Sequence, residues 1–172
     1  MLFSSYNSKY IDGLQFVPVT FPYNVPDALL IENLHVQQLI EYCNNKQIKK
    51  AFVQGFSDYS FLRACKCLEH IAIDLRLPFD AHAAQKSSTI LYDLRCMQAL
   101  PNLRSIDIRV NERPGYRAKV QLDLSAIETL EQFCGAYQLV NGIENSVHLK
   151  TLRVRGVRAQ NLDIFKKLIS LD

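Results

Sequence analysis

A short apolar pattern recurs along the chain and limits the folds that it can adopt. In each copy, an apolar residue is followed by two variable residues, a second apolar residue, one variable residue and a third apolar residue. The copies lead with Ile48, Leu68, Leu103, Leu130 and Leu149. The alternation at the end of each copy predicts a strand with one buried face. The copies of Ile48 and Leu130 are weaker, and in the latter Gly135 replaces the last apolar residue.

Segments with a different spacing precede several of these strands. Before Pro101, an apolar residue occurs at every third position: Leu91, Leu94, Met97 and Leu100. This spacing suits a helix or a tight succession of turns, which the proline then ends. Residues 59–67 and 123–129 have the same character. Each unit is therefore a helix or turn segment that leads into a strand, and it has to stack on its neighbours to bury its apolar side.

The arrangement resembles the leucine-rich repeat, and the likeness runs from Ile48 to Asp172. The leading residues are 20, 35, 27 and 19 positions apart, against about 20–29 in that family. The asparagine typical of the family occurs at its expected position only at Asn111. The resemblance implies an α/β fold, an irregular solenoid with a mostly parallel sheet on one face and helices or turns on the other.

The first 47 residues predict a cap for this solenoid. Residues 14–21 alternate like a strand, and Pro18 favours a place at the sheet edge. Residues 24–27 predict a turn, in which Asp27 caps a helix that continues through Tyr42. An edge strand followed by a helix would cover the exposed end of the stacked units.

The chain is therefore expected to form a single domain over residues 1–172. Its parts are an N-terminal cap over residues 1–47, repeat-like units over residues 48–160 and an amphipathic helix over residues 161–172. Asn161 is the expected cap of that helix, whose apolar stripe comprises Leu162, Phe165, Leu168 and Ile169. Residues 77–88 and 111–119 interrupt the repeats and are expected to be loops.

Composition narrows the function. Hydrophobic residues make up 48% of the chain and charged residues 22%, as in ordinary globular proteins. A net charge of +3 is too small for a dedicated nucleic-acid-binding protein. The N-terminus has no secretory signal pattern, and no apolar run reaches the roughly 20 residues of a membrane span. These features predict a cytoplasmic protein.

Residues with catalytic or metal-binding potential are few and scattered. The five cysteines form no CxxC pair, and none of the four histidines has a metal-ligand spacing. No glycine-rich phosphate-binding loop is present. We therefore expect no enzymatic activity, no metal and no cofactor. The enzymatic alternative is a site at His70 with Cys65 or Cys67. Reduced cysteines in a protein core are the more ordinary interpretation.

The outward positions of the predicted strands form a polar face that suits a partner protein. The candidate partner-binding residues are Phe52, His70, Asp74, Asp107, Arg109, Arg153 and Arg155. Phe52 could act as an apolar anchor. Asp74 and Asp107 lie on successive strands and could form an acid–base pair, although an ion pair with Arg109 is the more ordinary interpretation.

These observations predict a non-enzymatic protein–protein recognition domain. Small single-domain bacterial proteins of this kind often act as immunity proteins, so the resemblance implies inhibition of a toxin as a narrower function. The first alternative is a nucleic-acid-binding accessory protein that uses the basic residues Lys150, Arg153, Arg155 and Arg158. The second is the small enzyme with a Cys/His site. An exposed last strand would also allow a homodimer.

Overall fold

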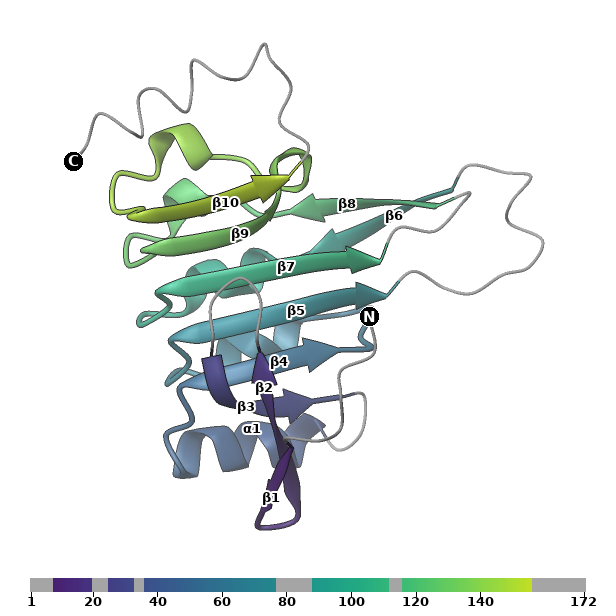
Figure 1. Ribbon diagram of the computed structural model, residues 1–172, viewed down its shortest axis with the longest axis vertical. Helices are drawn as coiled ribbons and strands as arrows, with labels where there is room; N and C mark the ends of the chain where they lie inside the picture. Colours follow the sequence, from purple (N-terminus) through teal and green to yellow (C-terminus); the bar gives the residue numbers. More distant parts are fainter. Residues whose placement is uncertain (1–7, 20–24, 33–35, 77–87, 112–115, 156–172) are drawn as a thin grey trace.

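The computed structural model describes residues 8–19, 25–32, 36–76, 88–111 and 116–155, and its main feature is an eight-stranded sheet (Figure 1). The strands, in spatial order, are β1 (Lys9–Ile11), β2 (Leu14–Val19), β3 (Val25–Ile31), β4 (Lys50–Gln54), β5 (His70–Arg76), β7 (Ser105–Asn111), β9 (Gln132–Ala136) and β10 (Thr151–Arg155). The pairs β1–β2 and β2–β3 are antiparallel, whereas every pair from β3 to β10 is parallel. The predicted α/β class with a mostly parallel sheet is thus confirmed.

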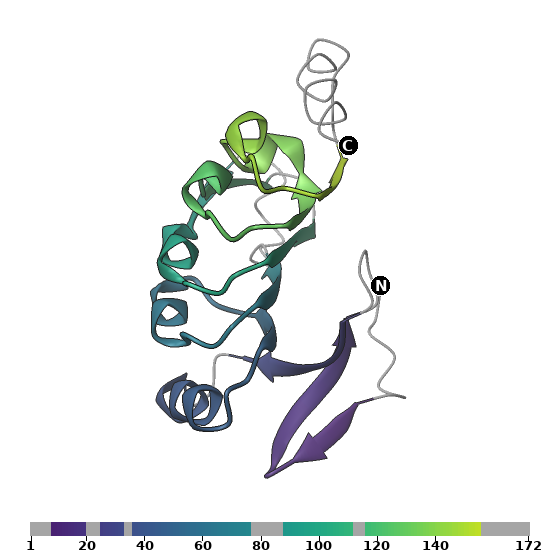
Figure 2. The same ribbon diagram turned by 90° about the vertical axis from the view of Figure 1, so that its left-hand side faces the viewer.

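Helices lie along one face of this sheet (Figure 2). They are the α-helix α1 (Val36–Asn45) and the short 3-10 helices η2 (Ser60–Ala64), η4 (Arg95–Ala99), η5 (Leu124–Ala126), η6 (Tyr137–Leu139) and η7 (Ile143–Asn145). The helix predicted through Tyr42 is confirmed as α1, and strands occur at all five copies of the apolar pattern. Among the described residues, no helix is long and apolar enough to cross a membrane.

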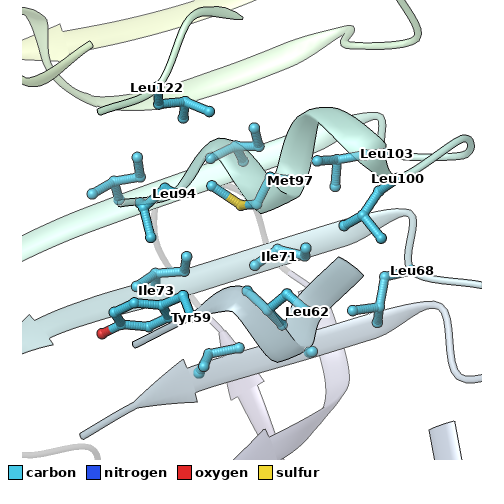
Figure 3. Packing of buried hydrophobic residues seen from close by; sticks show 14 of the residues in the cluster. Tyr59, Leu62, Leu68, Ile71, Ile73, Leu94, Met97, Leu100, Leu103 and Leu122 are labelled. Atoms are coloured by element: carbon cyan, nitrogen blue, oxygen red, sulfur yellow. The ribbon is translucent and has the colours of Figure 1, made fainter. Parts of the chain in front are cut away.

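The three-residue spacing of the sequence corresponds to 3-10 backbone geometry. The N–H groups of Leu62 and Met97 donate to the carbonyls three residues earlier, those of Tyr59 and Leu94, each at 3.0 Å. Residues three apart lie on one side of a 3-10 helix because it has three residues per turn. The residues spaced by three, Tyr59 and Leu62 at η2 and Leu94, Met97 and Leu100 at η4, are therefore all buried. They pack in one cluster with inward side chains of the sheet such as Ile71 and Ile73 (Figure 3).

The core between sheet and helices is continuous from α1 to η7. Its fully buried members include Leu62, Leu68, Ile71, Leu103 and Phe133. Gly135 occupies an inward position of β9 where other copies have an apolar side chain. The ring of Phe133 fills that space, because a Cβ built on Gly135 would lie 2.9 Å from the Phe133 Cζ atom.

A repeated backbone arrangement joins each unit to the next just before the strand. The carbonyl of Lys49 accepts hydrogen bonds from the N–H groups of Glu69 and His70, at 2.8 and 2.9 Å. The carbonyls of Glu69, Arg104 and Glu131 each accept two N–H groups from the following unit in the same way. This repetition fixes the register of β4, β5, β7, β9 and β10.

A second, two-stranded sheet was missed by the sequence prediction. It consists of the parallel strands β6 (Ser88–Asp93) and β8 (Tyr116–Gln121). The loop predicted over residues 111–119 is therefore wrong at both ends, because Asn111 ends β7 and residues 116–119 belong to β8. Leu91, expected in a helical segment, lies in β6. Residues 77–87 and 112–115 lie outside the described part of the chain.

The N-terminal cap also differs from the prediction. Strand β2 lies between β1 and β3 and not at the edge, and Pro18 is accommodated at an irregularity of register between Val17 and Val19. Asp27 caps no helix. It lies within β3 with a φ angle of 58° and forms an ion pair with Lys9 at 3.0 Å. The predicted closing helix over residues 161–172 lies outside the described residues.

Replacement of Gly142 by alanine should destabilise the fold. Gly142 has a φ angle of +77°, and a Cβ there would lie 2.0 Å from Asp123 Oδ1, which accepts a hydrogen bond from the N–H of Ser125. Backbone strain and a disturbed cap should together lower the free energy of unfolding by about 2–3 kcal/mol. Urea unfolding followed by circular dichroism measures this change.

Gly55→Ala is the matched control for this prediction. Gly55 has a similar φ angle of +83°, but a Cβ at this position would have no atom within 4 Å. Only the cost of the left-handed backbone should remain, about 1 kcal/mol. Equal losses in the two variants would show that the contact with Asp123 contributes nothing.

Candidate functional site

The face of the sheet opposite the helices, here called the outward face, carries side chains in rows. One row comprises Lys50, His70, Ser105, Gln132 and Thr151, and the next comprises Phe52, Ala72, Asp107, Cys134 and Arg153. The third row contains Gln54, Asp74 and Arg109, with Ala136 and Arg155 paired at the other end. The predicted outward positions are therefore in register across neighbouring strands. Six of the seven candidate residues, all except His70, lie in the second and third rows.

Phe52 does not provide an exposed anchor. Its side chain is 2% exposed and packs with Ala28 and Ala72, and with the partly buried Val17 and Leu30 of β2 and β3. The N-terminal strands thus bury the apolar end of the outward face. This corrects the interpretation of Phe52 as a partner-binding aromatic residue, since no local pattern indicates that the cap covers this position.

Asp107 and Arg109 form a largely buried ion pair on the outward face. The Asp107 Oδ2 atom accepts hydrogen bonds from Arg109 Nη2 at 2.7 Å and from Arg109 Nε at 2.9 Å. The side chains are 7% and 20% exposed. Burial raises the pKa of Asp107, and the guanidinium of Arg109 opposes that rise. The expected ion pair is present, but it joins two residues of one strand.

Asp74 is not placed opposite Asp107. In the register of β5 and β7, Asp74 lies opposite Arg109, and Asp107 lies opposite Ala72. Asp74 and Asp107 are therefore diagonal neighbours, and Arg109 lies beside both of them, opposite Asp74 and two residues after Asp107. An acid–base pair would need the two carboxylates to share a proton or a reacting group. This register instead favours neutralisation of their charge by Arg109.

The C-terminal end of the outward face is cationic and exposed. Arg153 and Arg155 are both exposed on β10. Arg155 acts electrostatically on Asp107 and on the thiol of Cys134, and burial raises the pKa of that thiol to about 11. A thiol with a raised pKa is a poor nucleophile at neutral pH. The outward face thus changes from buried and apolar at Phe52 to exposed and basic at β10.

His70 and the cysteines are not joined into a dyad by any described contact. Burial is the largest cause of the lowered pKa of His70, and the charged groups that act on it are Lys50, Glu69, Arg104 and Glu131. The thiol of Cys65 instead forms a hydrogen bond with the buried Cys43. The Nδ1 atom of His70 is buried and has no hydrogen-bond partner among the described residues.

A ladder of charges before the strands was missed by the sequence prediction. Lys49 contacts Glu69 at 2.8 Å, Arg104 contacts Glu131 at 3.4 Å, and Lys150 contacts Glu131 at 3.3 Å. These five residues follow the leading residue of each copy, and their charges alternate in sign. This alternation of charge at one position of the repeat is the sequence pattern from which the ladder could have been predicted.

A pocket of about 420 Å³ lies at the same end of the strands. It is lined by Pro101, Asn102, Arg104, Glu128, Thr129, Glu131, Val147, His148, Leu149 and Lys150. Its cations, Arg104 and Lys150, both pair with Glu131. No group of histidine, cysteine and carboxylate side chains within the described ranges could hold a metal ion.

Phe52→Ala should affect stability because Phe52 is a core residue. Loss of a buried phenylalanine side chain should lower the free energy of unfolding by about 3–5 kcal/mol. Tyr10→Ala is the control, since Tyr10 is 69% exposed and its loss should cost no more than about 0.5 kcal/mol. Thermal unfolding distinguishes these values, and a mild effect of Phe52→Ala would contradict the buried position.

Arg109→Met should produce a pH-dependent loss of stability. Without the guanidinium, burial should raise the pKa of Asp107 further. Below the ordinary aspartate pKa of about 4, the carboxyl is protonated in both folded and unfolded chains, so wild type and variant should differ little. As pH rises through the raised folded-state pKa, the variant should lose stability, by about 3 kcal/mol at neutral pH.

Urea unfolding of both proteins between acid and neutral pH measures this dependence. Arg104→Met is the control, because Arg104 forms an exposed ion pair with Glu131 that should contribute less than about 1 kcal/mol. A pH-independent difference between wild type and Arg109→Met would show that Asp107 is not the group responsible.

Comparison of the chain with protein-family models, curated proteins and solved structures gave no match.

Proposed function

We propose that this chain is a non-enzymatic domain of the leucine-rich-repeat type that binds another protein through the outward face of β7, β9 and β10. The observation that carries the proposal is the register of the outward rows, which end in the exposed Arg153 and Arg155. Ser105, Asp107 and Cys134 are buried within these rows, so the accessible part of the face is at β10, whose exposed cations select an acidic partner.

The repeat interpretation is supported by the way in which the units stack. In the eight-stranded sheet, each strand from β4 onwards follows a helix or a 3-10 segment that packs on the same face, and equivalent carbonyls join successive units. We infer that these units form an irregular solenoid. A narrower form of the proposal, based on the resemblance alone, is an immunity-type inhibitor whose partner is a toxin.

The arrangement of charge favours protein over nucleic acid as the partner. Asp74 and the buried Asp107 share the outward face with the arginines, and Arg109 is already engaged with Asp107. A nucleic-acid site would be expected to present a more continuous basic surface to the phosphates. Acidic and basic groups side by side suit a protein surface of complementary charge.

The proposal is tested with the double charge reversal Arg153→Glu and Arg155→Glu. The immobilised wild-type protein is incubated at physiological salt with a nuclease-treated lysate of the organism that produces it, and bound proteins are identified by mass spectrometry. A partner that uses the outward face should be retained by wild type and reduced by about tenfold or more in the variant, because two attractions become repulsions.

Arg63→Glu with Lys66→Glu is the matched control. It makes the same change in net charge, at exposed residues in and just after η2, on the helix-covered side of the sheet. The control should retain the partner. If both double variants lose it equally, net charge and not the outward face controls binding. If capture occurs only from a lysate that has not been treated with nuclease, the partner is a nucleic acid.

A further inference from the structure

Strand β10 lies at one end of the order of described strands, where it pairs with β9. Its inward residues Leu152 and Val154 are only half-buried, although they pack against the core. The equivalent residues of the interior strands, Phe133 and Ile106, are fully buried. Within the described part of the chain, the apolar core is therefore covered less completely at β10 than at the interior strands.

The backbone of β10 presents hydrogen-bonding groups on the side away from β9. The N–H of Thr151 donates to the carbonyl of Glu131, which places Thr151 toward β9. In a parallel pair, alternate residues direct their N–H and C=O groups to opposite sides. Leu152 and Val154 therefore direct theirs away from β9, where an additional strand could pair with them.

Charge at this edge determines which strand fits. The outward residues Arg153 and Arg155 are exposed cations. The last residue of the ladder of alternating charges, Lys150, is also positive. Opposite charges on directly facing residues of neighbouring strands stabilise a sheet, whereas like charges destabilise it. Two copies of β10 paired edge to edge would bring their arginines together, so this edge disfavours a homodimer.

We propose that β10 accepts an extended segment of the partner protein as an additional strand, in which acidic residues on the outward face alternate with apolar residues on the inward face. Its acidic side chains pair with Arg153 and Arg155, and its apolar side chains cover Leu152 and Val154. The inference rests on the proposed function and specifies the chemistry of the partner.

The test uses the full chain and a short fluorescent peptide in which glutamate and valine alternate. Binding is followed by fluorescence anisotropy, and hydrogen exchange of the amides of residues 151–155 is followed by NMR. The expected result is saturable binding with slower exchange of the Leu152 and Val154 amides. A peptide in which lysine and valine alternate, and one with the same glutamates and valines in separate blocks, should bind about tenfold more weakly or not at all.

Two variants separate the parts of the proposal. Arg153→Glu with Arg155→Glu should reverse the preference, so that the lysine peptide binds better than the glutamate peptide. Val154→Pro removes an N–H on the side away from β9, a position where edge strands tolerate proline, and should weaken binding of the glutamate peptide by about fivefold or more. Thermal unfolding verifies that each variant is folded.

The outcomes distinguish this inference from the proposed function. If the glutamate peptide does not bind wild type, or binds without slowing exchange in β10, strand addition is wrong. If in addition the lysate partner is lost by the arginine reversal but retained by Val154→Pro, the outward face binds the partner and only the edge inference fails. If no partner depends on the arginines, both proposals fail.

Discussion

Burial of apolar side chains between the sheet and its helices is the interaction on which the rest of the structure depends. Residues spaced by three around the 3-10 segments, such as Leu94 and Met97, pack in one cluster with inward residues of the strands, such as Ile71 and Ile73 (Figure 3). A one-residue slip of a strand would turn its apolar side chains outward. Core burial therefore fixes the strand register, and the repeated carbonyl contacts before each strand support it.

The outward face follows from that register. Once the inward positions are set, the intervening residues form rows across the sheet, and their chemistry changes from one end to the other. The N-terminal strands bury Phe52, the pair of Asp107 and Arg109 occupies the middle, and exposed arginines lie on β10. The most accessible charge is thus at the strand where the core is least covered, which links the proposed face to the proposed strand addition.

Several features could be predicted from residue patterns because their causes are local. Alternation of apolar residues predicted β5, β7 and β10, and three-residue spacing predicted turns that are realised as 3-10 helices. The strands β6 and β8 were missed because their sequences lack the repeated pattern. The role of Asp27 was mistaken because a helix-cap residue type also suits a strand position with positive φ.

The sequence by itself determined the α/β class, the strands of the repeat and the residues that share the outward face, because apolar periodicity specifies which side of each element is buried. Tertiary structure alone decided which outward residues are accessible. Phe52 is covered by strands distant in sequence, Asp107 is neutralised by Arg109 instead of facing Asp74, and Cys65 contacts Cys43 and not His70. Burial and pairing on a face depend on what packs over it and on register between strands, and neither is encoded in local periodicity.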